Sequence, residues 1–600
     1  MQEVMIVDDS ASEASSVTLG DEPDDEWLHS EYEQESLPTS PDIPDHQPSV
    51  EEEGREVIDL TTGEGFCDGD YLTDEAYERL LRNWNKREER SSAAQVPVRT
   101  RPEKRRLPEV CMNEIVYREG QSVELHDGTF LRIEVILADR SGDIFFCGRR
   151  LLKTTNHKGT YIPRWRNELV WITNEMADIP FDLVKTFVGI TFTNHCHLSQ
   201  DDRKKARPFD LFCRLKEHIG GKNPSSVEYL TPEEADEGFK YDPQMLRYAW
   251  RGQTSLFGAF EQTGVVEIDD DETVLAQNDA VRAMKRRRQY TFGDAFCGAG
   301  GVSCGARAAG LRPKWACDKS PHAAETYQLN YSNADVWNLD IFDFLEANSD
   351  PKVDIIHGSP PCQTFSPAKT IECATDDANS ACVFSCSNLI QKAKPRVLTM
   401  EETSGLIERH SETSNRVVLD FIELGYGTRW GILNCVNYGV PQMRRRSVII
   451  ASGPGETLPP FPKPTHGLPG SGLPLFITID QTISRIPLEA ANHNVDRASA
   501  GGIWRAPFDA DQQARTITCG GGENNYHPSG ERGYTNREYA CLQTFPVRYQ
   551  FGQKEVRKQI GNAVPPKLAE ALYKEIIRSL HQTDEKELGR RRGWITDVGR

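Results

Sequence analysis

Apolar positions in the second half of the chain fall into short runs that alternate with amphipathic stretches. Five apolar runs predict strands, at Tyr290–Phe296, Lys314–Asp318, Val353–His357, Arg396–Glu401 and Ser447–Ala451. Other stretches fit helices, at Ala306–Gly310, Pro321–Asn330, Glu412–Leu424 and Lys567–Leu580. Strands that alternate with helices in this way predict an α/β fold with a mainly parallel, doubly wound sheet.

The first half has a different pattern, typical of short strands. Between about residues 110 and 215, apolar runs such as Ser122–Leu125, Phe130–Leu137 and Ile144–Cys147 are separated by turn residues. We therefore expect a β-rich domain at 110–215, an irregular linker at 216–288 and the α/β domain at 289–580. A Gly/Pro-rich insert at about 452–530 interrupts the α/β domain, and a charged tail is expected at 581–600.

The negative charge of the chain is concentrated at one end. The net charge is −21, but residues 1–80 hold 25 Asp and Glu against Arg55 and Arg79, which leaves 66 acids and 68 bases for the other 520 residues. Residues 1–95 are also poor in apolar side chains, so we expect a disordered acidic tail. The acidity of the whole chain therefore does not argue against an anionic partner for the folded part.

Several classes of protein are disfavoured by the composition. No run of 18 apolar residues and no signal-peptide pattern occurs, so we expect neither a membrane protein nor a secreted one. The 15 cysteines form no CxxC pair, which indicates reduced intracellular thiols. His195-Cys196-His197 has no second ligand pair at a suitable spacing, so no metal site is expected.

Candidate chemistry lies at the predicted strand ends. The Gly-rich turn Asp294–Gly301 lets a ligand approach the backbone, although many such turns only pack a helix on a sheet. Asp318 and Asp340 follow two strands and suit a ribose and an adenine amino group, or serve as helix caps and turn residues.

A nucleophile and its partners are expected on the neighbouring strands. Cys362 follows Gly358–Pro361 directly after a strand, where two prolines would hold a reactive thiol; the alternative is an inert buried thiol. Glu401 ends the next strand. Arg444 and Arg446 share a face if the chain there is extended, or form a solvated basic turn.

These blocks, in this order, resemble the DNA (cytosine-5)-methyltransferases. The resemblance covers roughly residues 290–580 and rests on six blocks: Asp294–Gly301, Gly358–Ser366, Glu401, Gln442–Arg446, Arg537–Pro546 and Gln559–Pro565. It implies a Rossmann-like methyltransferase domain that uses S-adenosyl-L-methionine, with 452–530 as a small target-recognition region. Because that region is short, we expect little base-specific readout beyond the target cytosine.

The resemblance also implies roles for single residues. Cys362 would attack C6 of a cytosine flipped out of DNA, and Glu401 would bind N3. Arg446, with Arg444 behind it, would hold O2 and favour the thiolate. The cofactor would contact nine residues: Phe296, Gly298, Gly300, Asp318, Asp340, Ile341, Pro361, Asn562 and Val564.

The chain departs from the family after Glu401, where Glu402-Thr403 replaces Asn-Val. This variant resembles the fungal RIP-defective class and implies silencing of repeats or chromatin. Adjacent strand residues face opposite ways, so Glu402 should lie outside the base pocket. As a second carboxylate nearby, it should raise the apparent pKa of the carboxyl pair. The alternative is that Glu402 misplaces Glu401 and lowers activity. Pro367–Ala381 is the expected lid, and its acids would weaken contact with phosphates.

Partners and location are suggested by the first half. Residues 115–200 resemble a bromo-adjacent homology (BAH) domain, which implies histone or nucleosome contact; an unrelated small barrel is the alternative. Val57–Thr61 resembles a SUMO-interacting motif. The basic segments Arg101–Arg106 and Lys285–Arg288, with the DNA substrate, favour the nucleus. Two other functions stay open: a chromatin-binding regulator with weak or no catalysis, and an RNA cytosine-5 methyltransferase.

Overall fold

The computed structural model describes part of the chain. The described residues are 66–67, 71–72, 104–153, 160–161, 165, 167–175, 178–196, 211–220, 224–252, 289–347, 349–361, 365, 376–500, 504–520 and 525–598. Most of the expected acidic tail lies outside them, including Val57–Thr61; only two short strands in it are described, β1 (Phe66–Cys67) and β2 (Tyr71–Leu72). The basic segment Lys285–Arg288, His197 and Arg101 also lie outside the described residues.

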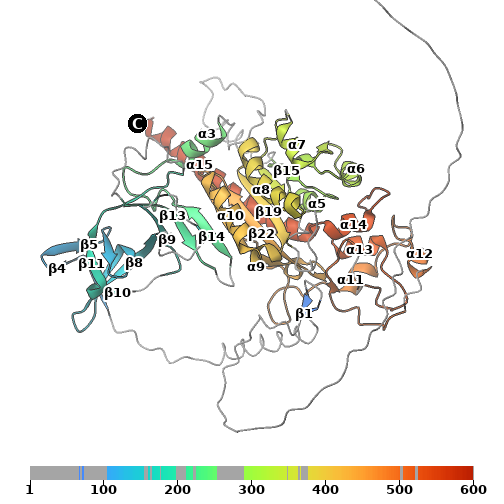
Figure 1. Ribbon diagram of the computed structural model, residues 1–600, viewed down its shortest axis with the longest axis horizontal. Helices are drawn as coiled ribbons and strands as arrows, with labels where there is room; N and C mark the ends of the chain where they lie inside the picture. Colours follow the sequence, from blue (N-terminus) through green and yellow to red (C-terminus); the bar gives the residue numbers. More distant parts are fainter. Residues whose placement is uncertain are drawn as a thin grey trace, which may run out of the picture. The chain divides into compact units, whose positions relative to one another are not determined.

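The second half of the chain forms a mixed sheet with helices (Figure 1). Its strands are β15 (Thr291–Ala295), β16 (Arg312–Cys317), β17 (Asp335–Trp337), β18 (Ile355–Gly358), β19 (Val397–Thr403), β20 (Gly427–Asn434) and β22 (Arg445–Ser452). Their order is β17-β16-β15-β18-β19-β22-β20; the first five are parallel, and β22 runs antiparallel to both neighbours. The predicted α/β sheet is confirmed, and the five predicted strands coincide with β15, β16, β18, β19 and β22.

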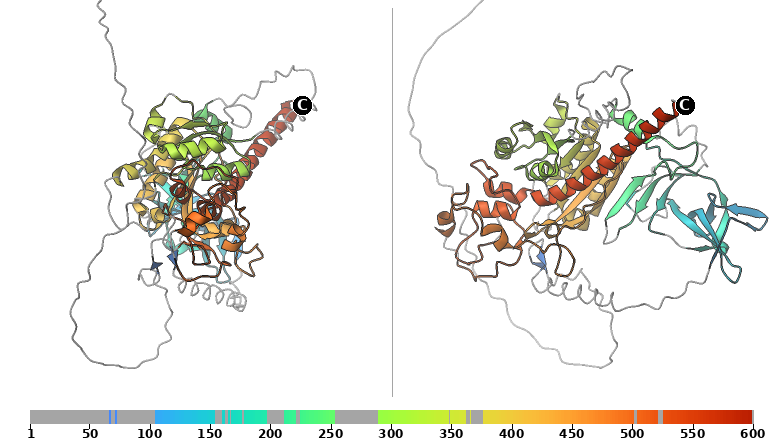
Figure 2. Two further views of the ribbon diagram at one scale, coloured as in Figure 1. Left: turned by 90° about the vertical axis from the view of Figure 1, so that its right-hand side faces the viewer. Right: turned by 180° about the vertical axis from the view of Figure 1, so that it is seen from behind.

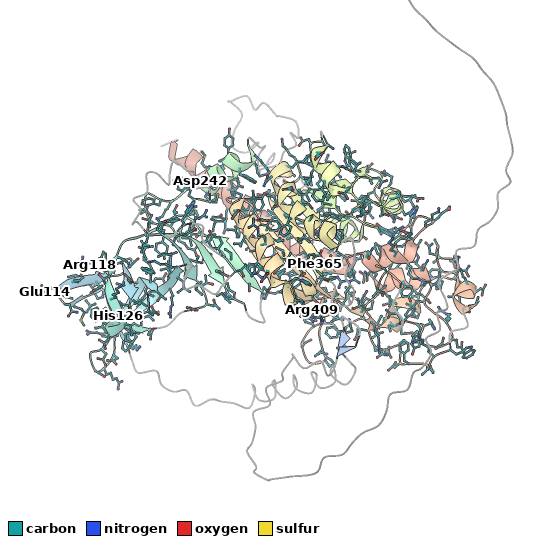
Figure 3. The ribbon with its side chains drawn as sticks, viewed as in Figure 1. Glu114, Arg118, His126, Asp242, Phe365 and Arg409 are labelled. Atoms are coloured by element: carbon teal, nitrogen blue, oxygen red, sulfur yellow. The ribbon has the colours of Figure 1, made fainter. Side chains whose placement is uncertain are left out.

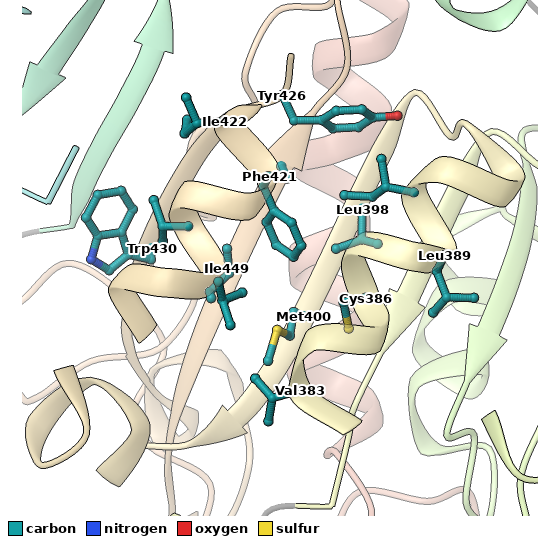
Figure 4. Packing of buried hydrophobic residues seen from close by; sticks show 14 of the residues in the cluster. Val383, Cys386, Leu389, Leu398, Met400, Phe421, Ile422, Tyr426, Trp430 and Ile449 are labelled. Carbon is teal, nitrogen blue, oxygen red and sulfur yellow. The ribbon is translucent and has the colours of Figure 1, made fainter. Parts of the chain in front are cut away.

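Helices cover both faces of this sheet. On one face, α5 (Gly301–Ala309) and α15 (Pro566–Val598) share an apolar cluster with β15, β19 and β22. On the other face lie α8 (Asp376–Ala393) and α10 (Ser411–Glu423). Figure 4 shows Val383 and Leu389 of α8 packed beside Leu398 and Met400 of β19, with Phe421 of α10. Alternate residues of β19 therefore serve two separate cores.

The connections place a crevice at the centre of the sheet. The chain leaves β15 towards β16 on one side and later returns to β18 on the other side. The loops after β15 and β18 therefore meet at the carboxyl edge, where the Ser359 amide donates to the Ala295 carbonyl at 3.3 Å. Such a switch point is where open α/β sheets bind ligands.

The β-rich half is continuous with this sheet. Its strands are β3 (Arg105–Leu107), β4 (Glu109–Met112), β5 (Ile115–Arg118), β6 (Ser122–Leu125), β7 (Phe130–Ala138), β8 (Ile144–Lys153), β9 (Glu168–Ile172), β10 (Ile179–Pro180), β11 (Val184–Val188), β12 (Ile190–Phe192), β13 (Leu211–His218) and β14 (Ser225–Tyr229). The expected boundary at residue 215 falls inside β13. Beyond it, β14 pairs antiparallel with β20, so a strand of the expected linker covers an edge of the α/β sheet.

The expected linker and charged tail also contain helices. Helix α3 (Pro243–Arg251) lies in the linker, and α15 continues through the expected tail to Val598 (Figure 2). The tail prediction differs from the structure because its acids meet buried arginines: Asp584 accepts from Arg396 at 2.7 Å, and Glu587 accepts from Arg247 at 2.7 Å. Among the described residues, no helix has the length and apolar character needed to cross a membrane.

The insert and the last motifs form a smaller helical part. It contains α11 (Ile479–Ile483), α12 (Val495–Ala500), α13 (Asn536–Leu542) and α14 (Val556–Asn562). Strand β21 (Gln442–Met443) pairs in parallel with β23 (Ala514–Arg515), which lies within the expected target-recognition region. This pairing connects the insert, through hydrogen bonds between strands, to the segment just before β22.

Candidate active site

The expected nucleophile, Cys362, lies outside the described residues. The chain is described on both sides of it. Pro361 follows β18 and the buried Pro360, while Phe365 is buried and meets His410 edge-to-face at 5.3 Å between ring centroids. Figure 3 labels Phe365 and the neighbouring Arg409. The thiol role of Cys362 stays a prediction, in a loop whose two ends are fixed at the carboxyl edge.

Glu401 and Arg446 are brought together, as the sequence predicts. Arg446 Nε lies 2.9 Å from Glu401 Oε1, and both side chains are buried. The antiparallel pairing of β19 with β22 places them there, since Thr403 lies opposite Arg446. The second carboxylate oxygen, Oε2, accepts from Ser359 Oγ at 3.1 Å. Both oxygens of Glu401 therefore have a donor, and one donor comes from the loop that carries Cys362.

Behind Ser359 lies a chain of buried polar groups that the sequence analysis missed. His357 Nε2 is 2.7 Å from Ser359 Oγ, and its Nδ1 is 2.8 Å from Thr399 Oγ1. Thr399 Oγ1 is in turn 2.9 Å from the Tyr573 hydroxyl. Burial lowers the pKa of His357 to about 3, so this imidazole is neutral. The sequence signal that could have identified this chain of groups is a histidine and a serine, His357 and Ser359, just before Pro360-Pro361.

Glu402 faces away from Glu401, as predicted. It is 1 % exposed and lies near Cys386 of α8, whose thiol pKa is raised to about 12 by burial and by this carboxyl. Its Oε2 accepts from the Thr403 amide at 3.1 Å, and its Oε1 has no hydrogen-bond partner among the described residues. Burial, and next the charge of Glu401, raise the pKa of Glu402 well above its usual value. Glu402 is therefore a neutral carboxyl.

Arg444 has different partners from Arg446. Its Nη1 donates to the Ile517 carbonyl at 2.9 Å, and its Nη2 donates to the carbonyls of Gly561 and Ala563 at 3.1 and 3.2 Å. The expected shared face requires an extended chain, but the Arg444 amide donates back to the Gln442 carbonyl at 3.0 Å. This turn is centred on Met443, before Arg444, and Arg444 binds the backbone on both sides of Asn562.

The Gly-rich turn after β15 is shaped by three positive φ angles. Phe296 has φ +59°, a conformation that costs energy for a bulky residue, and Gly298 and Gly300 have φ +51° and +79°. A Cβ on Gly300 would lie 2.8 Å from the Tyr549 hydroxyl, so this glycine serves packing. A Cβ on Gly298 would have no atom within 4 Å. The turn is therefore open at Gly298, beside the half-buried ring of Phe296.

The two acids at strand ends are held by backbone amides. Asp318 Oδ2 accepts from the Gly298 amide and Oδ1 from the Ser320 amide, both at 2.8 Å, and burial raises its pKa. Asp340 caps α7 (Ile341–Glu346) through the Phe342 amide at 3.1 Å, which confirms the cap interpretation. Each carboxylate oxygen has a further lone pair, so these contacts leave room for a ligand hydroxyl or amine.

The other expected cofactor residues complete the same edge. Ile341 and Val564 are buried, Pro361 is half-buried, and Asn562 is exposed, with its Oδ1 accepting from Cys519 Sγ at 2.7 Å. An aromatic ring, a carboxylate and an open glycine turn suit the adenine, the ribose hydroxyls and the close approach of an adenosine group. The residues present therefore fit S-adenosylmethionine, and the described residues contain no group of side chains able to hold a metal ion.

The comparison with known proteins agrees with this geometry. The model of the C-5 cytosine-specific DNA methylase family matches residues 290–500 and 482–578. The type II methyltransferase M.NgoFVII of Neisseria gonorrhoeae is 31% identical over 332 residues, which are 48% of this chain and 87% of that protein. The chain belongs to the C-5 cytosine-specific DNA methylase family. It is an S-adenosylmethionine-dependent DNA (cytosine-5)-methyltransferase.

Two further similarities cover about half of this chain. The type II methyltransferase M1.HphI of Haemophilus parahaemolyticus is 28% identical over 324 residues, 48% of this chain and 87% of that protein. The solved structure of the methyltransferase EhMeth of Entamoeba histolytica has a TM-score of 0.37 at 16% identity and covers 49% of this chain and 99% of that one. The described strands before residue 252 lie outside the range of the family model.

Proposed function

We propose that this methyltransferase methylates C5 of a cytosine that has rotated out of duplex DNA, through a transient bond to Cys362. The observation that carries the proposal is the placement of Glu401. Its carboxyl is held by Arg446 and by Ser359, and Ser359 belongs to the loop of Cys362. Since C6 is inaccessible inside a duplex, the base must leave the stack before a thiolate can reach it.

The chemistry follows from the charges that develop on the base. Attack by Cys362 Sγ forms an S–C6 bond and moves an electron pair into the ring, so N3 and O2 become more basic. Glu401 takes up a proton from solvent as the base arrives and donates it to N3, while the Arg446 guanidinium stabilises O2. Bound S-adenosylmethionine supplies the methyl group for C5. Loss of the C5 proton to water then returns the electron pair and expels Cys362 as thiolate.

The cofactor is held at the switch point in this proposal. Phe296 stacks on the adenine, and Asp318 accepts from the ribose hydroxyls. Asp340 and Ile341 contact the adenine edge. The remaining contacts come from the open turn, the nucleophile loop and the last motif: Gly298, Gly300, Pro361, Asn562 and Val564. Arg444 acts indirectly, because it binds the carbonyls on either side of Asn562.

The biological setting is part of the same proposal. The Glu402-Thr403 departure resembles the fungal RIP-defective class, which supports silencing of repeats or chromatin in a nucleus. The β-rich half, which the family model does not match, supports contact with histones or nucleosomes through a BAH-like domain. Val57–Thr61 supports binding to SUMO.

A methyl-transfer assay tests the catalytic proposal. Radiolabelled S-adenosylmethionine is offered with unmethylated DNA, hemimethylated DNA and transfer RNA, to the wild type and to Cys362→Ser. We expect label in DNA with the wild type alone, and a covalent complex with DNA that contains 5-fluorocytosine. Label in transfer RNA alone would favour the RNA methyltransferase. Cofactor binding without label in any substrate would favour the regulator.

A further inference from the structure

A row of hydrogen bonds leads from helix α15 to the carboxyl of Glu401. It starts at the Tyr573 hydroxyl, passes Thr399 and His357, and ends at Ser359, whose Oγ lies 3.1 Å from Glu401 Oε2. Tyr573, Thr399 and His357 are all buried, and Ser359 is half-buried. Four side chains therefore form one continuous row, and its last member, Ser359, bonds Glu401.

The direction of each bond follows from the acceptor at its end. An ionised carboxylate only accepts, so Ser359 Oγ–H donates to Glu401 Oε2. Ser359 Oγ then accepts from His357, and a neutral imidazole has one N–H, which must be on Nε2. Nδ1 consequently accepts from Thr399 Oγ1–H, whose oxygen accepts from the Tyr573 hydroxyl. In this arrangement every donor in the row has an acceptor and Ser359 donates to Glu401; the Ile356 carbonyl, 3.4 Å from Thr399 Oγ1, is a second acceptor for Thr399.

We propose that Ser359, oriented by His357, is a positioning residue that fixes the carboxyl of Glu401 for its contact with the base. The inference rests on the proposed catalytic function of Glu401. A glutamate side chain has three rotatable bonds, and Arg446 Nε contacts one of its oxygens, Oε1. The Ser359 hydroxyl holds the other oxygen, so the plane of the carboxyl is set before a base arrives.

The same contact joins the nucleophile loop to the strand of the acid. Ser359 lies three residues before Cys362, and Gly358 pairs with Met400 between β18 and β19. Pro360 and Pro361 then fix the backbone that leads to the thiol. The start of the nucleophile loop is therefore joined to the strand of Glu401 through one hydroxyl group as well as through the sheet.

The test compares variants that remove or keep this hydroxyl. Ser359→Ala should lower kcat about tenfold, with the KM for DNA and the Kd for S-adenosylmethionine within about twofold of the wild type. Ser359→Thr keeps a hydroxyl and should recover kcat to within about threefold. His357→Phe breaks the row at its centre and should lower kcat in the same direction as Ser359→Ala.

Ser447→Ala is the matched control. The Ser447 hydroxyl is buried beside the same strand, but it donates to the backbone carbonyls of Glu402 and Thr403. Its loss should leave kcat within about twofold of the wild type. All variants are compared by thermal melting and by calorimetric titration with S-adenosylmethionine, so that a general loss of structure is recognised.

A double variant distinguishes failure of the proposed catalytic function of Glu401 from failure of the positioning role of Ser359. In the Glu401→Gln background, Ser359→Ala should cause no further loss in single-turnover rate, because both changes remove one interaction. Full activity of Glu401→Gln would overturn the proposed function itself. An impaired Glu401→Gln with a fully active Ser359→Ala, or with additive losses in the double variant, would overturn the positioning role alone.

Discussion

Replacing Glu402 by glutamine should make the stability of the protein less dependent on pH. Glu402 is 1 % exposed, and Oε1 has no partner among the described residues. Its folded-state pKa lies well above the usual value because burial disfavours the charged form. A carboxyl with a raised folded pKa contributes stability that is fully present below the unfolded pKa of about 4.3 and is lost as pH rises through the folded pKa.

The size of the effect follows from proton linkage. Between the unfolded and folded pKa values, one carboxyl changes the free energy of unfolding by up to about 1.4 kcal/mol per pH unit. Glutamine has a similar shape and does not titrate. The advantage of Glu402→Gln over the wild type should therefore grow with pH above about 4.3, at up to that slope. Urea unfolding of both proteins at pH 5, 6, 7 and 8 and constant ionic strength measures it.

The control is a glutamate whose ion pair is solvent-exposed. Glu408 bonds Arg445 at 2.6 Å, with both side chains more than a third exposed, so Glu408→Gln should give a nearly constant difference across the series. A Glu402→Gln advantage that stays flat between pH 5 and 8 would refute a neutral, buried Glu402. Activity gives an independent check: the two carboxyls face opposite sides of β19, so Glu402→Asn should change kcat by less than about threefold. A large increase would mean that Glu402 misplaces Glu401.

Two further predictions concern packing around α15. Gly305→Ala should lower stability by about 1–3 kcal/mol, seen as a lower melting temperature, because its Cβ would lie 2.3 Å from the Pro566 carbonyl oxygen; an unchanged melting temperature would contradict this contact. Arg396→Met should cost about 3–5 kcal/mol in urea unfolding, because it leaves the buried acids Glu456 and Asp584 without the guanidinium that bonds both; a loss below about 1 kcal/mol would show that these charges are solvated.

Local sequence patterns were sufficient to predict the α/β fold, but they did not predict that β14 joins its sheet or that α15 continues beyond residue 580. The apolar runs identified β15 and β19, because these strands are buried on both faces, and α6 spans Pro321–Asn330 as predicted. The pairing of β14 with β20 joins segments about 200 residues apart and has no local signature. A charged tail was expected at 581–600, because the sequence does not reveal that Arg396 lies buried opposite Asp584 of α15.

In the candidate site, too, some residues were predicted from the sequence and others were missed. Motif order identified Glu401 and Arg446, and the sheet brings them into contact. Arg444 was grouped with Arg446 by spacing and by the resemblance, and neither indicated that it donates to the carbonyls around Asn562. Ser359 and His357 were missed because a polar residue in a loop and a histidine in a strand have many ordinary uses. Their role depends on distances to Thr399 and Glu401, which lie about 40 residues away.

The adjacent carboxyls of β19 can coexist because the strand divides their surroundings. Two ionised groups this close would repel each other strongly in a buried place. Glu401 faces the guanidinium of Arg446 and the hydroxyl of Ser359, whereas Glu402 has one amide donor and the apolar side of α8. The donors are therefore on the face of Glu401, whereas burial raises the pKa of Glu402. The Glu402 carboxyl therefore lies in the core behind Glu401, and the contacts of Glu401 with Arg446 and Ser359 do not involve it.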